Sequence, residues 1–285
     1  MTTVIECHPV APISPVPDLK AIKVKQQATW SSGDYAVIGT TLQIVGEQLA
    51  EAMDLRAGQK VLDIAAGNGN ATLAAARRWC EVTSTDYLET LLSNGRRRAD
   101  AEGFRVRFQI ADAENLPFAD ATFDAVVSTF GAMFSPDQQR TASEIMRVCK
   151  PGGRIGLANW TPESFVGQMF RTIAKYMPPP AGVKSPAIWG TRDWLSAAFG
   201  PAAAQVVAEP RSFVFRYLSP RHFLDTFRAY YGPALKAFEA LDAAKREALA
   251  RDIVDLVGRF NRSGDGTMVV PGEYLEVIIT TRRGP

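Results

Sequence analysis

The sequence contains little cysteine or histidine and no long uninterrupted run of apolar residues. Three cysteines and two histidines are scattered over 285 residues, which gives neither a zinc-ligand spacing nor a disulfide framework. No apolar segment is long enough to span a bilayer, and the first residues lack a basic segment followed by an apolar one. We therefore expect no bound metal, no membrane insertion and a reducing, cytoplasmic environment.

The sequence also lacks an excess of charge of one sign. Its 32 basic and 30 acidic residues leave a net charge of +2, whereas nucleic-acid-binding domains usually concentrate basic residues on one face. The basic run Arg96-Arg97-Arg98 falls in a helical stretch and is expected to be a solvated helix face. No nucleic-acid partner is expected, and the 46% hydrophobic content predicts an ordinary globular core.

A strand, a glycine turn and a helix follow one another over residues 61–78, and the rest of the chain is organised around them. The apolar residues at 61–64 predict a buried strand, and Gly67-Asn68-Gly69 predicts a tight turn. The alanine-rich stretch 73–78 predicts a helix. Glycines let a ligand approach the backbone, and a helix N-terminus offers free N–H donors. The turn is therefore a candidate ligand site; the alternative is a glycine turn that merely joins the strand to the helix.

The residues around the turn indicate which class of ligand to expect. A dinucleotide fingerprint requires a third glycine where this chain has Thr72, and it holds a pyrophosphate at the helix N-terminus. Asp63, inside the strand, would repel a pyrophosphate and suits a cationic group. The pattern from Asp63 through Ala65, Gly67 and Gly69 resembles motif I of class I S-adenosylmethionine-dependent methyltransferases. In that family the acidic residue faces the methionine ammonium group, and glycine is commoner at the position of Ala65.

Two further acidic residues end the next predicted strands. Asp86 lies 86 − 63 = 23 residues after Asp63, which is close to the spacing of a ribose-binding acid. Asp112 follows the strand at 106–110. The family resemblance implies that Asp86 accepts from the ribose hydroxyls, that Asp112 accepts from the adenine amino group, and that the Ala113 N–H meets a ring nitrogen. Asp86 also precedes a helix, so it is a candidate helix cap as well.

Two other segments strengthen the resemblance. Residues 114–118 (Glu-Asn-Leu-Pro-Phe) are similar to a stretch of the ubiquinone/menaquinone C-methyltransferase-like, or type 11, branch, and residues 144–160 match its helix, Pro-Gly-Gly turn and strand. The resemblance is close over residues 58–160. It implies an α/β fold with a Rossmann-like, seven-stranded, mostly parallel sheet, an antiparallel last strand and helical cap insertions. The implied cofactor is S-adenosyl-L-methionine.

The chain is expected to form one compact unit with four parts. Residues 1–17 form a flexible proline-rich tail, and residues 18–57 form N-terminal helices that cover the cofactor. Residues 58–160 form the Rossmann-like core that binds S-adenosylmethionine. Residues 161–285 supply cap helices, the last two strands and the acceptor site.

Residues from several segments are expected to contact the cofactor. The segment from Trp30 to Tyr35 resembles one that folds over the cofactor in related small-molecule methyltransferases, or else it pins a helix to the sheet. Residues after the fourth strand border the carboxyl edge of the sheet, where ligands bind. The full predicted set is Trp30, Tyr35, Asp63, Ala65, Gly67, Asn68, Gly69, Asp86, Tyr87, Asp112, Ala113, Ser128, Phe130 and Phe134.

The predicted reaction is methyl transfer to a small, hydrophobic or aromatic acceptor, with catalysis mainly by positioning. His222 is the candidate general base, although a lone histidine before an apolar helix is more often structural. Tyr230 or Tyr231 is expected to orient an acceptor hydroxyl. An NAD(P)-dependent oxidoreductase and a non-catalytic S-adenosylmethionine-binding module remain as alternatives. The sequence leaves open whether carbon, oxygen or nitrogen is methylated, and it leaves open the oligomeric state, with a homodimer as one option.

Overall fold

A seven-stranded sheet with the order β3-β2-β1-β4-β5-β7-β6 forms the centre of the protein. The computed structural model describes residues 17–283, so the tail predicted for residues 1–17 lies, apart from residue 17, outside the described residues. The five strands β1 to β5 run parallel, and β7 lies antiparallel between β5 and β6. The strands are β1 (Lys60–Ile64), β2 (Glu81–Asp86), β3 (Arg107–Ile110), β4 (Phe123–Thr129), β5 (Cys149–Trp160), β6 (Ala203–Tyr217) and β7 (Met268–Thr281). The predicted fold class is confirmed.

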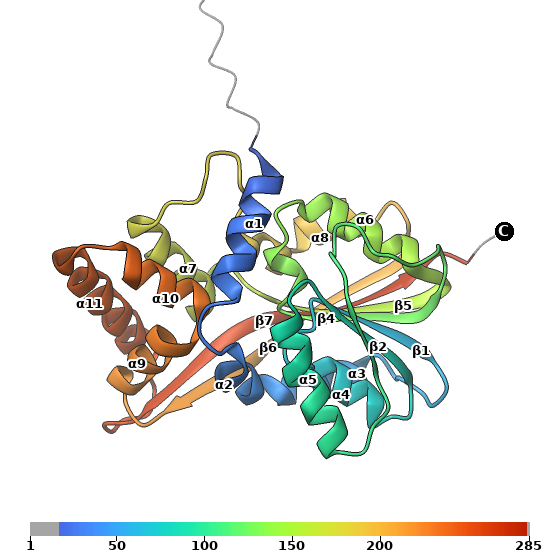
Figure 1. Cartoon of the computed structure of the whole chain (residues 1–285), viewed down its shortest axis with the longest axis horizontal. Helices are drawn as coiled ribbons and strands as arrows, with labels where there is room; N and C mark the ends of the chain where they lie inside the picture. Colours follow the sequence, from blue (N-terminus) through green and yellow to red (C-terminus); the bar gives the residue numbers. More distant parts are fainter. Residues whose placement is uncertain (1–16, 284–285) are drawn as a thin grey trace, which may run out of the picture.

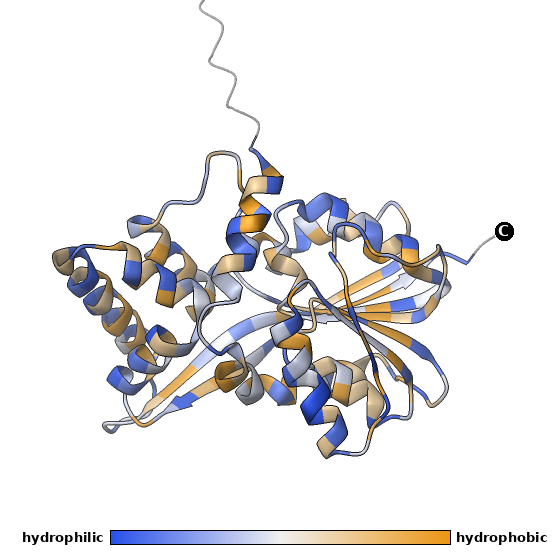
Figure 2. Cartoon of the chain, viewed as in Figure 1, coloured by the Kyte–Doolittle hydropathy of each residue, from blue (hydrophilic) through white to orange (hydrophobic). Residues whose placement is uncertain are grey.

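Helices cover both faces of the sheet (Figure 1). One face carries α3 (Gln43–Ala52), α4 (Asn70–Ala76) and α5 (Glu89–Ala101), and the other carries α6 (Gln138–Val148) and α8 (Arg192–Phe199). Figure 2 shows hydrophobic residues along the central strands and hydrophilic residues on exposed parts of helices such as α5 and α11. This arrangement buries a parallel sheet between two helical layers, as parallel sheets require. None of the helices within residues 17–283 is long and apolar enough to cross a membrane.

Strands β6 and β7 extend beyond β5 as a two-stranded ribbon. The pairing of β7 with β5 ends at Tyr274, opposite Trp160, while residues 268–273 continue to pair with 212–217 of β6. Four helices pack beside this ribbon (Figure 1). They are α7 (Phe165–Tyr176), α9 (Pro220–Tyr230), α10 (Gly232–Ala240) and α11 (Ala243–Phe260). We call this group of four helices the cap.

Two elements differ from the sequence pattern for local reasons. The pattern suggests one helix over 233–260, but the chain breaks at Leu241, and Asp242 caps α11 by accepting from the Lys245 N–H at 2.9 Å. The pattern suggests two short strands around Pro210, whereas β6 runs through it without interruption. Pro210 is tolerated because β6 is an edge strand and needs no second set of backbone hydrogen bonds.

The N-terminal helices lie between the cap and the sheet (Figure 1). Helix α1 (Leu19–Trp30) begins after Asp18, whose carboxylate accepts from the Ala21 N–H, and it contains no fully buried residue. It is followed by α2 (Tyr35–Gly39) and a short 3-10 turn, η1 (Thr40–Leu42). Few apolar contacts therefore hold α1, and its polar contacts matter more.

Candidate functional site

The turn between β1 and α4 has a backbone that most residues avoid. Gly67 and Gly69 have φ values of 57° and 84°, in the left-handed region, and Ala65 also lies there at 50°. A non-glycine residue in this region costs about 1–2 kcal/mol. Gly131, after β4, accommodates the turn, because a Cβ there would lie 2.1 Å from the Ala65 carbonyl oxygen. The turn thus adopts a left-handed backbone at three positions, and the one at Ala65 is energetically unfavourable.

A pocket opens beside this turn, at the carboxyl ends of the parallel strands. It encloses about 880 Å³, including space open to solvent. The predicted residues that line it are Trp30, Tyr35, Ala65, Gly67, Asn68, Asp86, Tyr87, Asp112, Ala113, Phe130 and Phe134. Residues that the sequence reasoning missed also line it, among them Lys23, Gln26, Leu42, Asn70 and Glu114.

Asp63 lies beneath the turn, is only 1% exposed and, unlike most of the predicted cofactor contacts, is not part of the pocket lining. Its Oδ2 is 2.6 Å from Thr72 Oγ1, which is in turn 2.8 Å from Ser84 Oγ. Because a hydroxyl has one proton, Thr72 donates to Asp63 and accepts from Ser84. Asp63 Oδ1 has no partner among the described residues, and burial raises the pKa of this carboxyl to about 7. The sequence reasoning used Thr72 only to weigh the dinucleotide fingerprint and missed its contact with Asp63.

Asp86 is buried at the end of β2 and holds two backbone groups. Its Oδ2 accepts from the Gly67 N–H and its Oδ1 from the Leu88 N–H, both at 3.0 Å. Burial raises its pKa to about 6, although these hydrogen bonds oppose the shift. Asp86 therefore anchors both the glycine turn and the start of α5. Each oxygen keeps a lone pair for a donor in the pocket.

Asp112 and Glu114 meet a lysine from a distant part of the chain. Lys23 Nζ on α1 donates to Asp112 Oδ2 at 2.6 Å and is paired with Glu114 Oε2. Burial alone would lower the pKa of Lys23, but these two carboxylates together raise it above its ordinary value. On the same helix, Gln26 Nε2 donates to the Phe134 carbonyl at 3.1 Å. Helix α1 is thus fastened to both sides of the pocket.

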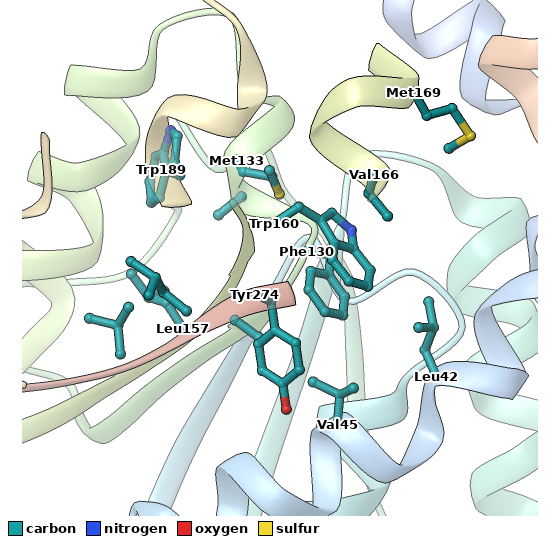
Figure 3. Close-up of a cluster of buried hydrophobic side chains, with 14 of the residues drawn as sticks. Leu42, Val45, Phe130, Met133, Leu157, Trp160, Val166, Met169, Trp189 and Tyr274 are labelled. Atoms are coloured by element: carbon teal, nitrogen blue, oxygen red, sulfur yellow. The ribbon is translucent and has the colours of Figure 1, made fainter. Parts of the chain in front are cut away.

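The opposite end of the pocket is aromatic. Trp30 makes edge contacts with Tyr35, Phe134 and Tyr231, with ring centroids 5.7, 5.0 and 5.5 Å apart. Phe130 lines the pocket and stacks on Trp160 at 3.9 Å (Figure 3). Among residues 17–283, the carboxylates that line the pocket are Asp86 at the end of β2 and Asp112 and Glu114 after β3. The pocket therefore has a charged end at β2 and β3 and an apolar end at β4.

The remaining predicted residues lie outside the pocket lining. Gly69 is the N-cap residue of α4, and Ser128 Oγ donates to the Ile64 carbonyl at 2.8 Å and accepts from the Ala132 N–H. His222 is exposed at the start of α9, where its Nδ1 accepts from the Leu218 N–H. Tyr230 is 40% exposed, whereas Tyr231 is 7% exposed and packs behind Trp30, where burial raises its pKa. Residues 17–283 contain no group of three potential metal ligands.

Comparisons with known proteins agree with this geometry. A sequence model described as a methyltransferase domain matches residues 61–153. The uncharacterized protein Rv1403c of Mycobacterium tuberculosis is 37% identical over 276 residues, which cover 95% of this chain and 98% of that protein. A demethylmenaquinone methyltransferase of Clavibacter sepedonicus is 37% identical over 135 residues, 46% of this chain and 55% of that enzyme. The crystal structure of YcgJ from Bacillus subtilis shares the fold, with a TM-score of 0.56, 22% identity, and coverage of 86% of this chain and 100% of that one.

The chain belongs to the class I S-adenosylmethionine-dependent methyltransferases. Its similarity to the mycobacterial protein extends over nearly the whole length, including the cap. The residues present fit the cofactor of this class, S-adenosyl-L-methionine. The unpartnered Asp63 oxygen is a buried acceptor that a cationic group would satisfy, and residues 65–68 of the turn line the pocket. An oxidoreductase that uses NAD(P) is not favoured.

Proposed function

We propose that this enzyme methylates a small, hydrophobic or aromatic organic molecule, and that it does so mainly by positioning. The observation that carries the proposal is the contrast between the two ends of the pocket. Three carboxylates lie at one end, while Trp30, Phe130 and Phe134 line the other. Apolar walls with few polar anchors are the usual lining of a small-molecule site.

The charged end suits the cofactor. We assign Asp63 to the ammonium group, Asp86 to the ribose hydroxyls, and Asp112 with the Ala113 N–H to the adenine ring. S-adenosylmethionine, when bound, supplies a methyl group activated by its sulfonium. Helix α1 and the segment from Trp30 to Tyr35 would cover this end and exclude water.

The aromatic end suits the acceptor. The carboxylates of the lining, Asp86, Asp112 and Glu114, lie at the charged end, where they hold two backbone N–H groups and Lys23. His222 faces solvent on α9, so no described residue at this end is placed as a general base. The acceptor must therefore be nucleophilic enough to react without a general base from the protein. Alignment of that atom with the methyl carbon and the sulfur can lower the barrier by roughly 7–11 kcal/mol without a base.

The class of acceptor is testable with cofactor that carries a tritiated methyl group. We expect label to pass to apolar aromatic acceptors, such as naphthols and hydroquinones, and to enter the organic phase on extraction. Charged amino acids, RNA and protein should remain unlabelled in parallel reactions. Transfer to a macromolecule, or only to charged acceptors, would exclude the proposal. Cofactor binding without transfer to any acceptor would favour the non-catalytic module.

The tyrosines on either side of the α9–α10 junction provide a matched pair. If the Tyr231 hydroxyl orients the acceptor, Tyr231→Phe should lower kcat by about tenfold, the worth of one hydrogen bond. Tyr230→Phe should leave kcat unchanged because Tyr230 is exposed. Both variants should keep the wild-type thermal midpoint, measured by circular dichroism. Equal kcat for all three proteins would assign Tyr231 to packing against Trp30 alone.

A further inference from the structure

Arg98 does not lie on a solvated face, as the basic run suggests. Its guanidinium turns inward from α5 and reaches the back of the glycine turn. Nη1 donates to the Asn68 carbonyl at 2.7 Å and to Asn70 Oδ1 at 2.9 Å, and Nη2 donates to Gln43 Oε1 at 2.9 Å. Arg97, its neighbour, is exposed. The prediction of a solvated face is therefore wrong for Arg98, because α5 buries the side of the helix that carries Gly95 and Ala99.

The positive charge of Arg98 is not cancelled where it lies. Its three partners are all neutral, and it has no carboxylate partner among residues 17–283. Glu102, the C-cap residue of α5, is the acid whose charge acts on Arg98, but its carboxylate is hydrogen-bonded to Arg77 instead. Burial lowers the pKa of the Arg98 guanidinium below its ordinary value. A half-buried cation without a counter-charge is unfavourable by itself, so its retention calls for a role.

The turn that Arg98 holds is fixed from the other side as well. Asn68 Nδ2 donates to Thr40 Oγ1 at 3.1 Å, and Asn70 Nδ2 donates to the Gly39 carbonyl at 2.7 Å. Gly95 of α5 also faces the turn, since a Cβ there would be in ordinary van der Waals contact with the Asn68 carbonyl carbon at 3.5 Å. Arg98 therefore completes a polar network that joins α5, the glycine turn and the N-terminal segment.

We propose that Arg98 is a positioning residue for the amino-acid end of the cofactor. It fixes the carbonyl of Asn68 and thereby holds the backbone of the turn, whose residues 65–68 line the pocket. It also places a positive charge behind the turn. The methionine carboxylate would bind near this turn, close to the buried carboxyls of Asp63 and Asp86, and the charge of Arg98 would offset the repulsion between them. A positive charge close to a site of low dielectric constant favours an anion there. The inference rests on S-adenosylmethionine being the cofactor.

Two ligands that differ only at the amino-acid end can test this role. S-adenosylhomocysteine carries the ammonium and carboxylate groups, and 5′-methylthioadenosine lacks both. By calorimetric titration, we expect Arg98→Gln to weaken S-adenosylhomocysteine at least tenfold and methylthioadenosine less than twofold. Arg97→Gln is the matched control on the same helix and should change neither affinity. A residue that only stabilises the fold would affect both ligands equally.

Equal weakening of both ligands by Arg98→Gln, or no weakening, would overturn the proposal. If Arg98→Gln does not fold, Arg98→Lys decides the question. It keeps the charge but loses the forked hydrogen bonds, so it should still weaken S-adenosylhomocysteine more than methylthioadenosine. Wild-type protein that binds neither ligand would instead contradict the cofactor assignment.

Discussion

Replacing Asp63 with asparagine is expected to weaken S-adenosylmethionine binding while stabilising the ligand-free protein. The variant loses a charge-assisted interaction with the ammonium group, worth about 1.5–3 kcal/mol or roughly 10- to 150-fold in affinity. The ligand-free protein no longer buries a carboxylate with an unpartnered oxygen. An unpaired amide costs less than an unpaired charge, so the free energy of unfolding at pH 8 should rise by about 1 kcal/mol or more.

The pH dependence gives the same experiment a second readout. The pKa of Asp63 is about 7 in the folded protein, against an ordinary value of 3.8. The folded state therefore binds this proton more tightly, and ligand-free stability should fall as pH rises from about 4 to 7. Cofactor affinity should rise through pH 7, because the ionised carboxylate binds the cation. Both slopes should shrink in Asp63→Asn. The slope that remains comes from Asp86, whose pKa is about 6.

Asp124→Asn is the matched control for this experiment. Asp124 lies at the other end of the sheet, where it is paired with Lys150. Its replacement should leave cofactor affinity and its pH dependence unchanged, as measured by titration calorimetry and thermal unfolding across pH 5–8. Wild-type affinity in Asp63→Asn would show that Asp63 serves only the packing beneath the turn.

Replacing Asp86 with asparagine should also cost about 1.5–3 kcal/mol of cofactor binding energy. Asparagine offers one acceptor oxygen, so its amide nitrogen must face the N–H of either Gly67 or Leu88. The ribose hydroxyls lose a charged acceptor, and the turn loses an anchor. Calorimetry measures the first effect, and the thermal midpoint measures the second. A lower midpoint with unchanged affinity would mean that Asp86 only holds the turn and the start of α5.

The sheet and the polar end of the pocket could be predicted because their signals are local. Strands β1, β2 and β4 are each followed by a turn and a helix, and β3 by a loop, so Asp86 and Asp112 are recognisable at strand ends. The carboxyl ends of parallel strands meet at one edge, which is why both line the pocket. The resemblance added the identity of the ligand.

The contacts of Lys23 and Arg98 could not be predicted in this way. Lys23 meets Asp112 across 89 positions of sequence, and no local pattern indicates how α1 docks. Arg98 lies at the margin of the buried face of α5, so its orientation depends on how the helix is rotated on the sheet. His222 shows the reverse case: it is outside the pocket lining, and its position near Ser219, which caps α9, is explained by local structure.

The ribbon formed by β6 and β7 connects the cap helices α9, α10 and α11 to the sheet. Residues 212–217 and 268–273 pair only with each other, beyond the end of β5. The segment between them, which contains α9, α10 and α11, can lengthen, shorten or change sequence without altering the register of the parallel strands. We therefore expect changes in this segment to alter the cap while the strands and strand ends that carry Asp63, Asp86 and Asp112 stay in place.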